Sequence, residues 1–199
     1  IDNNLYRKNG FIYLPKFFKK EEIKKIYNDT KIVFYRQFVE MRYTNQDYFQ
    51  ITDSEFNKFL YKLFDDDNER LINCGKQVQH LISLHQLSLD KKVIKLLNEV
   101  GLTSPIISTR PVLYFNHPNL AKNKVYHTVD AHQDWRSMQG SLDSVVIWIP
   151  LCNIPKELGA LEILPGSHLF GLRTDHIDNG FGMVKLSDNE KQNLITIEV

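Results

Sequence analysis

Residues 144–151 read Ser-Val-Val-Ile-Trp-Ile-Pro-Leu, which is the strongest strand signal in the chain. β-branched and aromatic side chains favour extended backbone. A strand that is apolar on both faces is normally covered from both sides by other structure. The run therefore predicts an inner strand, packed inside a barrel or between two layers.

Weaker strand signals lie on either side of this run. Residues 106–115 are rich in strand-forming side chains, and Leu161–Leu164 ends in Pro165-Gly166, a favourable turn pair. The last segment, residues 194–199, is also strand-like, so the chain is expected to end inside a strand. Near the other end, Gly10–Pro15 predicts a short strand closed by proline.

The part of the chain before Gly101 has helical spacing instead. Residues 18–42 place apolar side chains on one helical face, and residues 54–64 and 68–100 continue the pattern up to Gly101, a favourable helix stop. The sequence therefore predicts an α+β fold in one domain, with a helical part at 1–104 and a β-rich core at 105–199.

Composition excludes several classes of protein. A net charge of +1 gives no reason to expect a nucleic-acid partner, and no apolar run approaches the length of a membrane span. No CxxC pair exists that would support a zinc ribbon. Cys74 and Cys152, taken as buried free thiols, predict a reducing, cytoplasmic compartment, although a disulfide between them stays open.

The residues that point to chemistry are His132-Gln133-Asp134. In an extended segment, side chains at i and i+2 point to the same face, so an imidazole and a carboxylate converge. A third ligand would complete the two-His-one-carboxylate site that leaves open positions on Fe(II). On its own the tripeptide is weak evidence, because solvated His-x-Asp pairs are common.

The surroundings strengthen this interpretation. His132-Gln133-Asp134-Trp135, the Trp-containing strand, and then Gly159-Ala160-Leu161-Glu162-Ile163-Leu164-Pro165-Gly166-Ser167-His168 follow in order. This arrangement resembles the phytanoyl-CoA dioxygenase-like family of Fe(II)- and 2-oxoglutarate-dependent oxygenases. Residues 6–15 and the following helix also look like that family's beginning. The resemblance is strong over residues 132–168 and loose over 40–105.

The resemblance implies a double-stranded β-helix core, of the jelly-roll or cupin-like kind, with flanking N-terminal helices. It implies that His132 and Asp134 bind iron and that Gln133 and Trp148 lie near 2-oxoglutarate. A plain core tryptophan is the equally weighted alternative for Trp148. His168, in the family's PGSH segment, is expected to hold the turn.

Three further side chains are candidates for binding. Tyr114 and Asn116 share a strand face and are candidates for 2-oxoglutarate, although ordinary edge-strand residues are the simpler interpretation. Arg136 lies two residues beyond Asp134 and is a candidate for an anionic substrate, against the simpler interpretation of a surface arginine.

One part of the family's site has no counterpart here. The family supplies a distal His and, about ten residues later, an Arg that pairs with 2-oxoglutarate. After His168 the only arginine is Arg173 and the only histidine is His176. They stand in the wrong order and too close to His168 to match the family's pair. We therefore expect both residues to lie beyond Val199, with the C-terminal part of the core missing from this chain.

The predicted function is an oxygenase that uses Fe(II), 2-oxoglutarate and O2. A ferryl oxidant would abstract hydrogen from a small organic or carrier-bound substrate, and the hydroxyl group would rebound. The alternative is a non-catalytic jelly-roll or cupin-like binding domain without a complete iron site. No residue selects the substrate.

Overall fold

The computed structural model describes residues 2–114, 130–134, 141, 143–178 and 181–199. The chain divides into two compact units. One unit comprises Phe18–Asp90 with Arg110–Leu113, and the other comprises Ile1–Phe17, Lys91–Thr109 and Tyr114–Val199. We call them the helical unit and the site unit.

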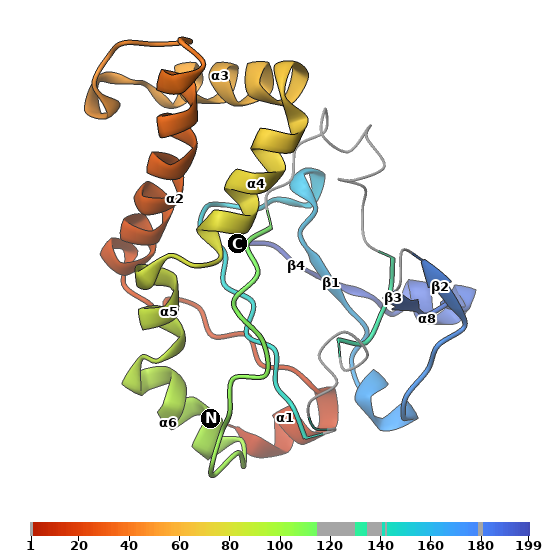
Figure 1. Cartoon of the computed structure of the whole chain (residues 1–199). Coiled ribbons are helices and arrows are strands. Elements are labelled where there is room, and N and C mark those ends of the chain that lie inside the picture. The colour runs from red at the N-terminus through yellow and green to blue at the C-terminus, as the bar shows by residue number, and fades with distance from the viewer. Residues whose placement is uncertain (1, 115–129, 135–140, 142, 179–180) are drawn as a thin grey trace. The chain divides into compact units, whose positions relative to one another are not determined.

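The helical unit is built from α2 (Lys20–Glu40), α3 (Asp53–Asp66), α4 (Asn68–Val78) and α5 (Ile82–Ser88), with a 3-10 turn, η1, at Tyr48–Gln50. Figure 1 shows α2 and α4 side by side, with α3 across their ends. The core side chains come from one face of each helix and are almost fully buried; they are Ile26, Phe34, Phe38, Phe56, Leu63, Leu71, Cys74 and Val78. This confirms the amphipathic helix predicted at 18–42.

Residues 68–100 form three helices, whereas the sequence pattern predicted continuous helical spacing. After α4, the amide groups of His80 and Leu81 bond to the carbonyl oxygens three residues earlier, which tightens the helix end into a 3-10 turn. Leu81 is then extended, and α5 begins at the next residue. Periodicity does not detect this break because the apolar spacing continues across it.

The helix α6 (Lys91–Glu99) belongs to the site unit and ends as predicted near Gly101. Gly101 has φ 108°. The amide of Leu102 bonds to the oxygen of Leu97 at 2.9 Å, and the amide of Gly101 bonds to that of Asn98 at 3.1 Å. These two bonds are the Schellman arrangement, which satisfies carbonyl groups at a helix end.

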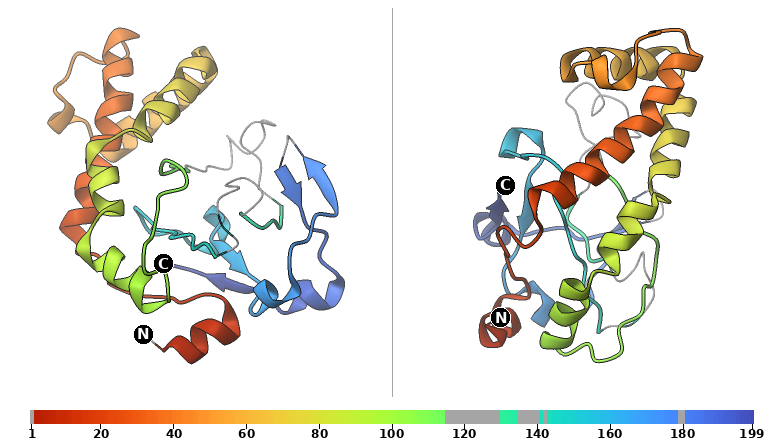
Figure 2. Two further views of the ribbon diagram at one scale, coloured as in Figure 1. Left: turned by 60° about the horizontal axis from the view of Figure 1, so that its bottom comes forward. Right: turned by 90° about the vertical axis from the view of Figure 1, so that its left-hand side faces the viewer.

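The strands of the site unit are short. β1 (Leu161–Ile163) pairs antiparallel with β4 (Ile195–Ile197), and β2 (His176–Asp178) pairs antiparallel with β3 (Phe181–Met183). A short helix, α8 (Asp188–Gln192), follows β3 (Figure 2, left). The predicted strands at 161–164 and 194–199 are confirmed by β1 and β4.

Other strand predictions differ from the structure. Residues 106–114 and 143–151 form no strand, and Val146 and Trp148 have exposed fractions of 58% and 36%. A buried inner strand needs a hydrogen-bonded neighbour on each side. The described residues form no such hydrogen-bonded ladder at either segment. The architecture that they show is a set of helices with two small two-stranded sheets.

The N-terminal segment also differs from its prediction. No strand forms at Gly10–Pro15, and a helix, α1 (Asn3–Asn9), capped by Asp2, precedes this segment. Gly10 follows the helix with φ 77°, and its amide bonds to the oxygen of Tyr6 at 2.7 Å. Gly10 therefore ends a helix, a role that its conformational freedom allows.

Candidate metal site

The site unit places His132 beside strand β3. His132 forms a single antiparallel bridge with Met183, and the amide of Val184 donates to the oxygen of Ala131 at 2.7 Å. Met183 and Val184 are buried, with exposed fractions of 3% and 8%. The backbone that carries His132 is therefore fixed to one of the few buried strand segments of this unit.

The side chains of His132 and Asp134 converge. Nε2 of His132 lies 3.4 Å from Oδ1 of Asp134, and both side chains are partly exposed. Nδ1 of His132 lies 2.8 Å from the backbone oxygen of Asp130. Because a carbonyl oxygen only accepts, Nδ1 must carry the proton, which directs Nε2 toward Asp134.

The charge of Asp134 affects the imidazole. The hydrogen bond to Asp134 raises the pKa of His132, and partial burial lowers it by a smaller amount. The hydrogen bond to the Asp130 oxygen raises the pKa further. A metal-binding imidazole commonly donates its other ring N–H to a backbone oxygen, which is the contact that Nδ1 of His132 makes with Asp130. A bound cation would compete with the proton at Nε2.

Gln133 points elsewhere. Its Nε2 donates to the backbone oxygen of Gly171 at 2.8 Å, and its Oε1 accepts from the backbone amide of Arg173 at 2.7 Å. Sequence reasoning missed this connection, since Arg173 lies forty positions away and no local pattern links the two.

Arg173 is committed to other partners. Its guanidinium pairs with Glu190 at 2.5 Å and donates to the oxygen of Lys185 at 3.0 Å. Asp175 Oδ2 lies 3.6 Å away. These contacts leave the guanidinium engaged within the protein, so it is not placed as a free anchor for a ligand carboxylate.

The two later histidines have different surroundings. Nε2 of His168 lies 2.9 Å from the backbone oxygen of Arg7, so His168 ties the turn after β1 to helix α1. His176 pairs in register with Met183, which also bridges to His132, so Met183 lies between the two histidines. Within the part of the chain that the structure describes, no group of three His, Cys, Asp or Glu side chains surrounds one point.

The structure describes only two of the four other residues that the sequence predicted to bind 2-oxoglutarate or substrate. Tyr114 and Trp148 are described, with exposed fractions of 77% and 36%. Asn116 and Arg136 lie outside the described residues. The structure does not bring Tyr114 or Trp148 into a described contact with His132 or Asp134.

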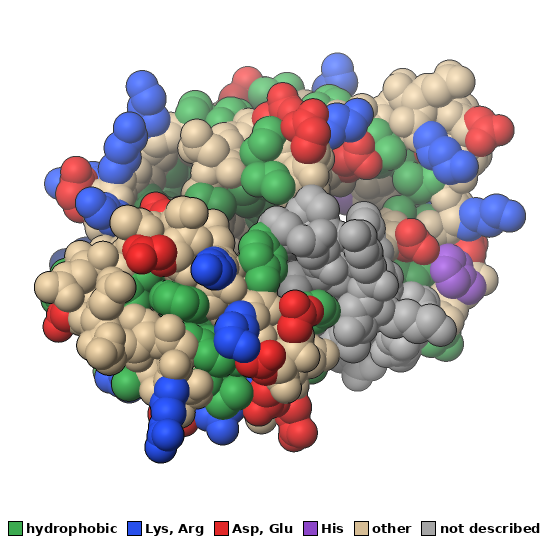
Figure 3. Space-filling view, turned by 90° about the horizontal axis from the view of Figure 1, so that it is seen from above, with side chains coloured by type: hydrophobic (Ala, Val, Ile, Leu, Met, Phe, Trp, Pro, Cys, Tyr) green, Lys and Arg blue, Asp and Glu red, His purple; other side chains and the backbone are tan. Residues whose placement is uncertain are grey.

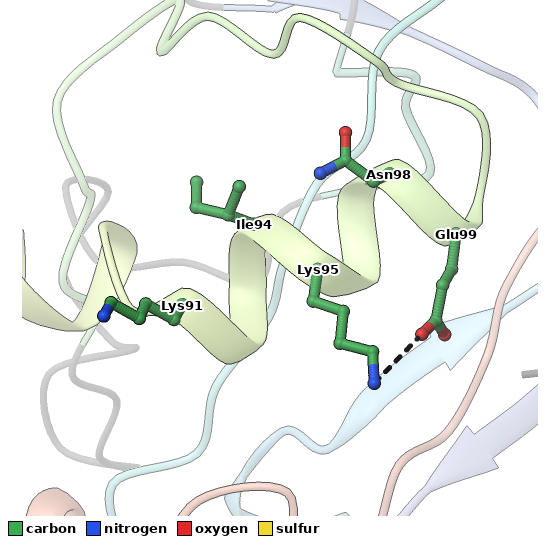
Figure 4. A pocket seen from close by; sticks show the side chains of 5 residues that line it. All are labelled: Lys91, Ile94, Lys95, Asn98 and Glu99. Carbon is green, nitrogen blue, oxygen red and sulfur yellow. Dashed lines mark ion pairs between the residues drawn. The ribbon is translucent and has the colours of Figure 1, made fainter.

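Other surface features do not extend this site. An open hollow of about 530 Å³ is lined by five residues of α6 alone, with Lys95 and Glu99 3.8 Å apart (Figure 4). Basic and acidic side chains are interspersed on the face in Figure 3.

Both cysteines are free, and Cys152 is exposed, which corrects the expectation that both thiols are buried. None of the described helices is long and apolar enough to cross a membrane.

The comparisons with known proteins bear on the same segment. The model of the phytanoyl-CoA dioxygenase (PhyH) family matches residues 6–194, which include His132, Asp134 and the PGSH turn. No curated protein and no solved structure matches the chain significantly. Members of the matched family are typically Fe(II)- and 2-oxoglutarate-dependent dioxygenases that act on small molecules. The match covers nearly all of the sequence, and the chain therefore belongs to the phytanoyl-CoA dioxygenase (PhyH) family.

Proposed function

We propose that this protein is an Fe(II)- and 2-oxoglutarate-dependent oxygenase that hydroxylates a small organic or carrier-bound substrate. The observation that carries the proposal is the 3.4 Å approach of His132 Nε2 to Asp134 Oδ1, in a segment that the family model covers. His132 and Asp134 are the proposed iron ligands.

The donor set fits the metal. An imidazole nitrogen and a carboxylate oxygen are two of the three protein ligands of a facial Fe(II) site. The Asp130 oxygen holds the imidazole in the tautomer that presents Nε2. When bound, the iron supplies the O2 activation that couples oxidation of 2-oxoglutarate to hydroxylation of a C–H bond. The protein's own task is to hold the ligands, orient the substrate and exclude water.

The other assignments belong to the same proposal. Trp148, Tyr114 and Asn116 are proposed contacts of 2-oxoglutarate, and Arg136 is a proposed substrate contact. Gln133 was expected near 2-oxoglutarate, but both ends of its amide bond to the 171–173 backbone. This competing role favours a supporting function for Gln133.

We also propose the family's architecture, a double-stranded β-helix core, with residues 1–199 in one oxygenase domain. The β1–β4 and β2–β3 pairs are consistent with antiparallel parts of such a core. The free state of Cys74 and Cys152 supports a reducing, cytoplasmic location.

The test is formation of succinate from 2-oxoglutarate by the full-length protein, with Fe(II) and ascorbate, in the presence and absence of O2. We expect O2-dependent succinate release, which Asp134→Ala abolishes because one ligand and its charge are lost. Asp188→Ala, on an exposed carboxylate of α8, should retain wild-type turnover. Binding of a small molecule with no turnover and no affinity for 2-oxoglutarate would favour the alternative, a non-catalytic jelly-roll domain.

A further inference from the structure

We infer that Gln133, Gly171 and Arg173 form a clamp that positions His132 and Asp134 by fixing the residue between them. The three are positioning residues, since the amide of Gln133 bonds to the backbone of Gly171 and Arg173 and would act on the metal only through its two neighbours. The inference rests on the proposed function for the identity of the site. Its contacts, however, all lie within the site unit and involve described residues only.

The direction of the side chains gives the first step. His132 forms the bridge with β3, and Asp134 follows it in a turn. His132 and Asp134 approach each other at 3.4 Å and therefore share one face. Gln133 lies between them in sequence, and its amide bonds to the backbone of residues 171–173. The clamp therefore holds the residue between the two proposed ligands, through a side chain that takes no part in their contact.

Both ends of the Gln133 amide are engaged. Its Nε2 donates to Gly171 at 2.8 Å, and its Oε1 accepts from the Arg173 amide at 2.7 Å. Two bonds of opposite polarity to one backbone segment fix both the position and the rotation of the side chain. A fixed side chain in turn fixes the backbone at Gln133. That backbone continues directly into His132 and Asp134, so their Cα atoms are held as well.

Gly171 has a backbone conformation that this arrangement requires. Its φ is 76° and its ψ is −169°, a region that essentially only glycine adopts. A Cβ added there would meet no atom within 4 Å, so the need for glycine is conformational and not steric. With Gly171 in this conformation, the Gly171 oxygen and the Arg173 amide both bond to the side chain of Gln133.

The segment that receives Gln133 is itself anchored. The Arg173 guanidinium pairs with Glu190 and bonds to the Lys185 oxygen, and Asp175 accepts from the Lys185 amide at 2.7 Å. Glu190 also accepts from the amide and hydroxyl of Ser187, both at 2.8 Å. Residues 173–175 are thereby joined to the start of α8 and to the chain after β3.

Two attachments therefore hold the metal pair. The backbone of 131–132 bonds to β3 through Met183 and Val184, and the side chain of Gln133 bonds to a loop tied to the chain just after β3. Outer groups that orient metal ligands typically change metal affinity by about 10- to 100-fold when they are removed. Loss of the clamp should have an effect of that size without removal of any ligand.

The experiment compares Gln133→Met with Gln192→Met in the full-length protein. Methionine preserves the length of the side chain and removes both hydrogen bonds. Gln192 is the exposed last residue of α8 and has no side-chain bond among the described residues, so it controls for the chemical change itself. The first measurement is Co(II) affinity and the visible spectrum of bound Co(II). The second is the set of ring NMR signals of His132 in metal-free protein, with Asp134→Ala as the reference for a disrupted pair.

We expect Gln133→Met to bind Co(II) about 10-fold more weakly or worse, with an altered Co(II) spectrum. Its His132 signals should shift toward those of Asp134→Ala, and Gln192→Met should match wild type in both measurements. If Gln133→Met does not fold, Gly171→Ala replaces it, because that variant keeps every clamp side chain and changes only the backbone preference at 171.

The outcomes separate the clamp from the proposed function. Wild-type His132 signals and Co(II) affinity in a folded Gln133→Met or Gly171→Ala variant would overturn the clamp, whether or not the protein is an oxygenase. A wild-type protein that binds no Co(II) through His132 and Asp134 would contradict the proposed function instead. The His132 signals in metal-free protein would then still decide on the clamp.

Discussion

Nε2 of His132 lies 3.4 Å from Oδ1 of Asp134, although Gln133 between them bonds to a segment forty positions away. Neighbouring side chains thus have different roles. His132 and Asp134 bring a ring nitrogen and a carboxylate together, whereas Gln133 attaches the same backbone to residues 171–173. This separation allows the ligands to be tested without disturbing their attachment.

The first prediction concerns the ligand charge. Asp134→Asn preserves the size of the side chain but removes its negative charge, so divalent metal should bind at least about 10-fold more weakly. Titration with Co(II), followed by visible absorption, measures this change. Asp188→Asn, on a side chain that is 96% exposed, is the matched control and should bind as wild type does. Equal affinity in the two variants would exclude Asp134 as a ligand.

The second prediction concerns a charge in the core of the helical unit. Lys31 is buried, and its Nζ lies 2.6 Å from Oδ1 of Asp53 and 4.6 Å from the centre of the Phe56 ring. Asp53→Ala should destabilise the protein by about 1–3 kcal/mol, because a buried ammonium group loses its anionic partner. Lys31→Met should cost less, since the stem still packs and the exposed carboxylate of Asp53 returns to water.

Urea denaturation of both variants measures the free energies of unfolding. Lys25→Met, at an exposed ion pair with Asp29, is the control and should change stability by no more than about 1 kcal/mol. A larger cost for Lys31→Met than for Asp53→Ala would contradict this account of the pair.

The third prediction concerns pH. The amide and hydroxyl of Ser187, followed by Arg173, lower the pKa of Glu190 to about 2 from its ordinary value of 4.5. A lowered carboxyl pKa stabilises the fold above the unfolded pKa, and this contribution is lost as pH falls through the folded pKa. Stability should therefore decrease between about pH 4.5 and pH 2 through this group. Chemical denaturation across that range should show the difference between wild type and Glu190→Gln shrinking as pH falls.

The same experiment on Ser187→Ala supplies a comparison. The Ser187 hydroxyl donates to Glu190 at 2.8 Å and is one of the groups that lower the pKa of Glu190. Ser187→Ala should therefore lose less stability than wild type as pH falls from about 4.5 to about 2. A difference for Glu190→Gln that stays constant from neutral pH to pH 2 would disprove the assignment.

The fourth prediction concerns the contact between helix α1 and the PGSH turn. A Cβ on Gly10 would overlap the imidazole ring of His168, and Gly10 also has φ 77°. Gly10→Ala therefore adds a collision to the cost of left-handed backbone, which alone is about 1–2 kcal/mol. Gly101→Ala, at φ 108° with no atom near the added Cβ, carries only the backbone cost.

Thermal unfolding should therefore show a larger loss for Gly10→Ala than for Gly101→Ala. Combining Gly10→Ala with His168→Ala removes the collision, so the two changes together should cost less than the sum of the separate changes. Additive costs would show that His168 does not restrict this position.

The sequence by itself determined the features that depend on near neighbours. The helix at α2, the helix stop at Gly101 and the short strands β1 and β4 follow from periodicity and from turn residues, which act over a few positions. The spacing of His132 and Asp134 predicted that their side chains share a face for the same reason. The order of the motifs then indicated the family that the family model shows.

Tertiary structure decided what depends on distant partners. The run at 144–151 has strand-forming residues, but a strand exists only where another segment supplies its hydrogen bonds, and no described residue does so there. The break of residues 68–100 into three helices is a different case, because it begins with a local tightening at His80 and Leu81 across which the apolar spacing continues. Gln133 shows the same limit as the run at 144–151: its residue type permits both a cofactor contact and a structural bond. Only the approach of Gly171 and Arg173 selects between them, because a hydrogen bond depends on positions in space and not on separation along the chain.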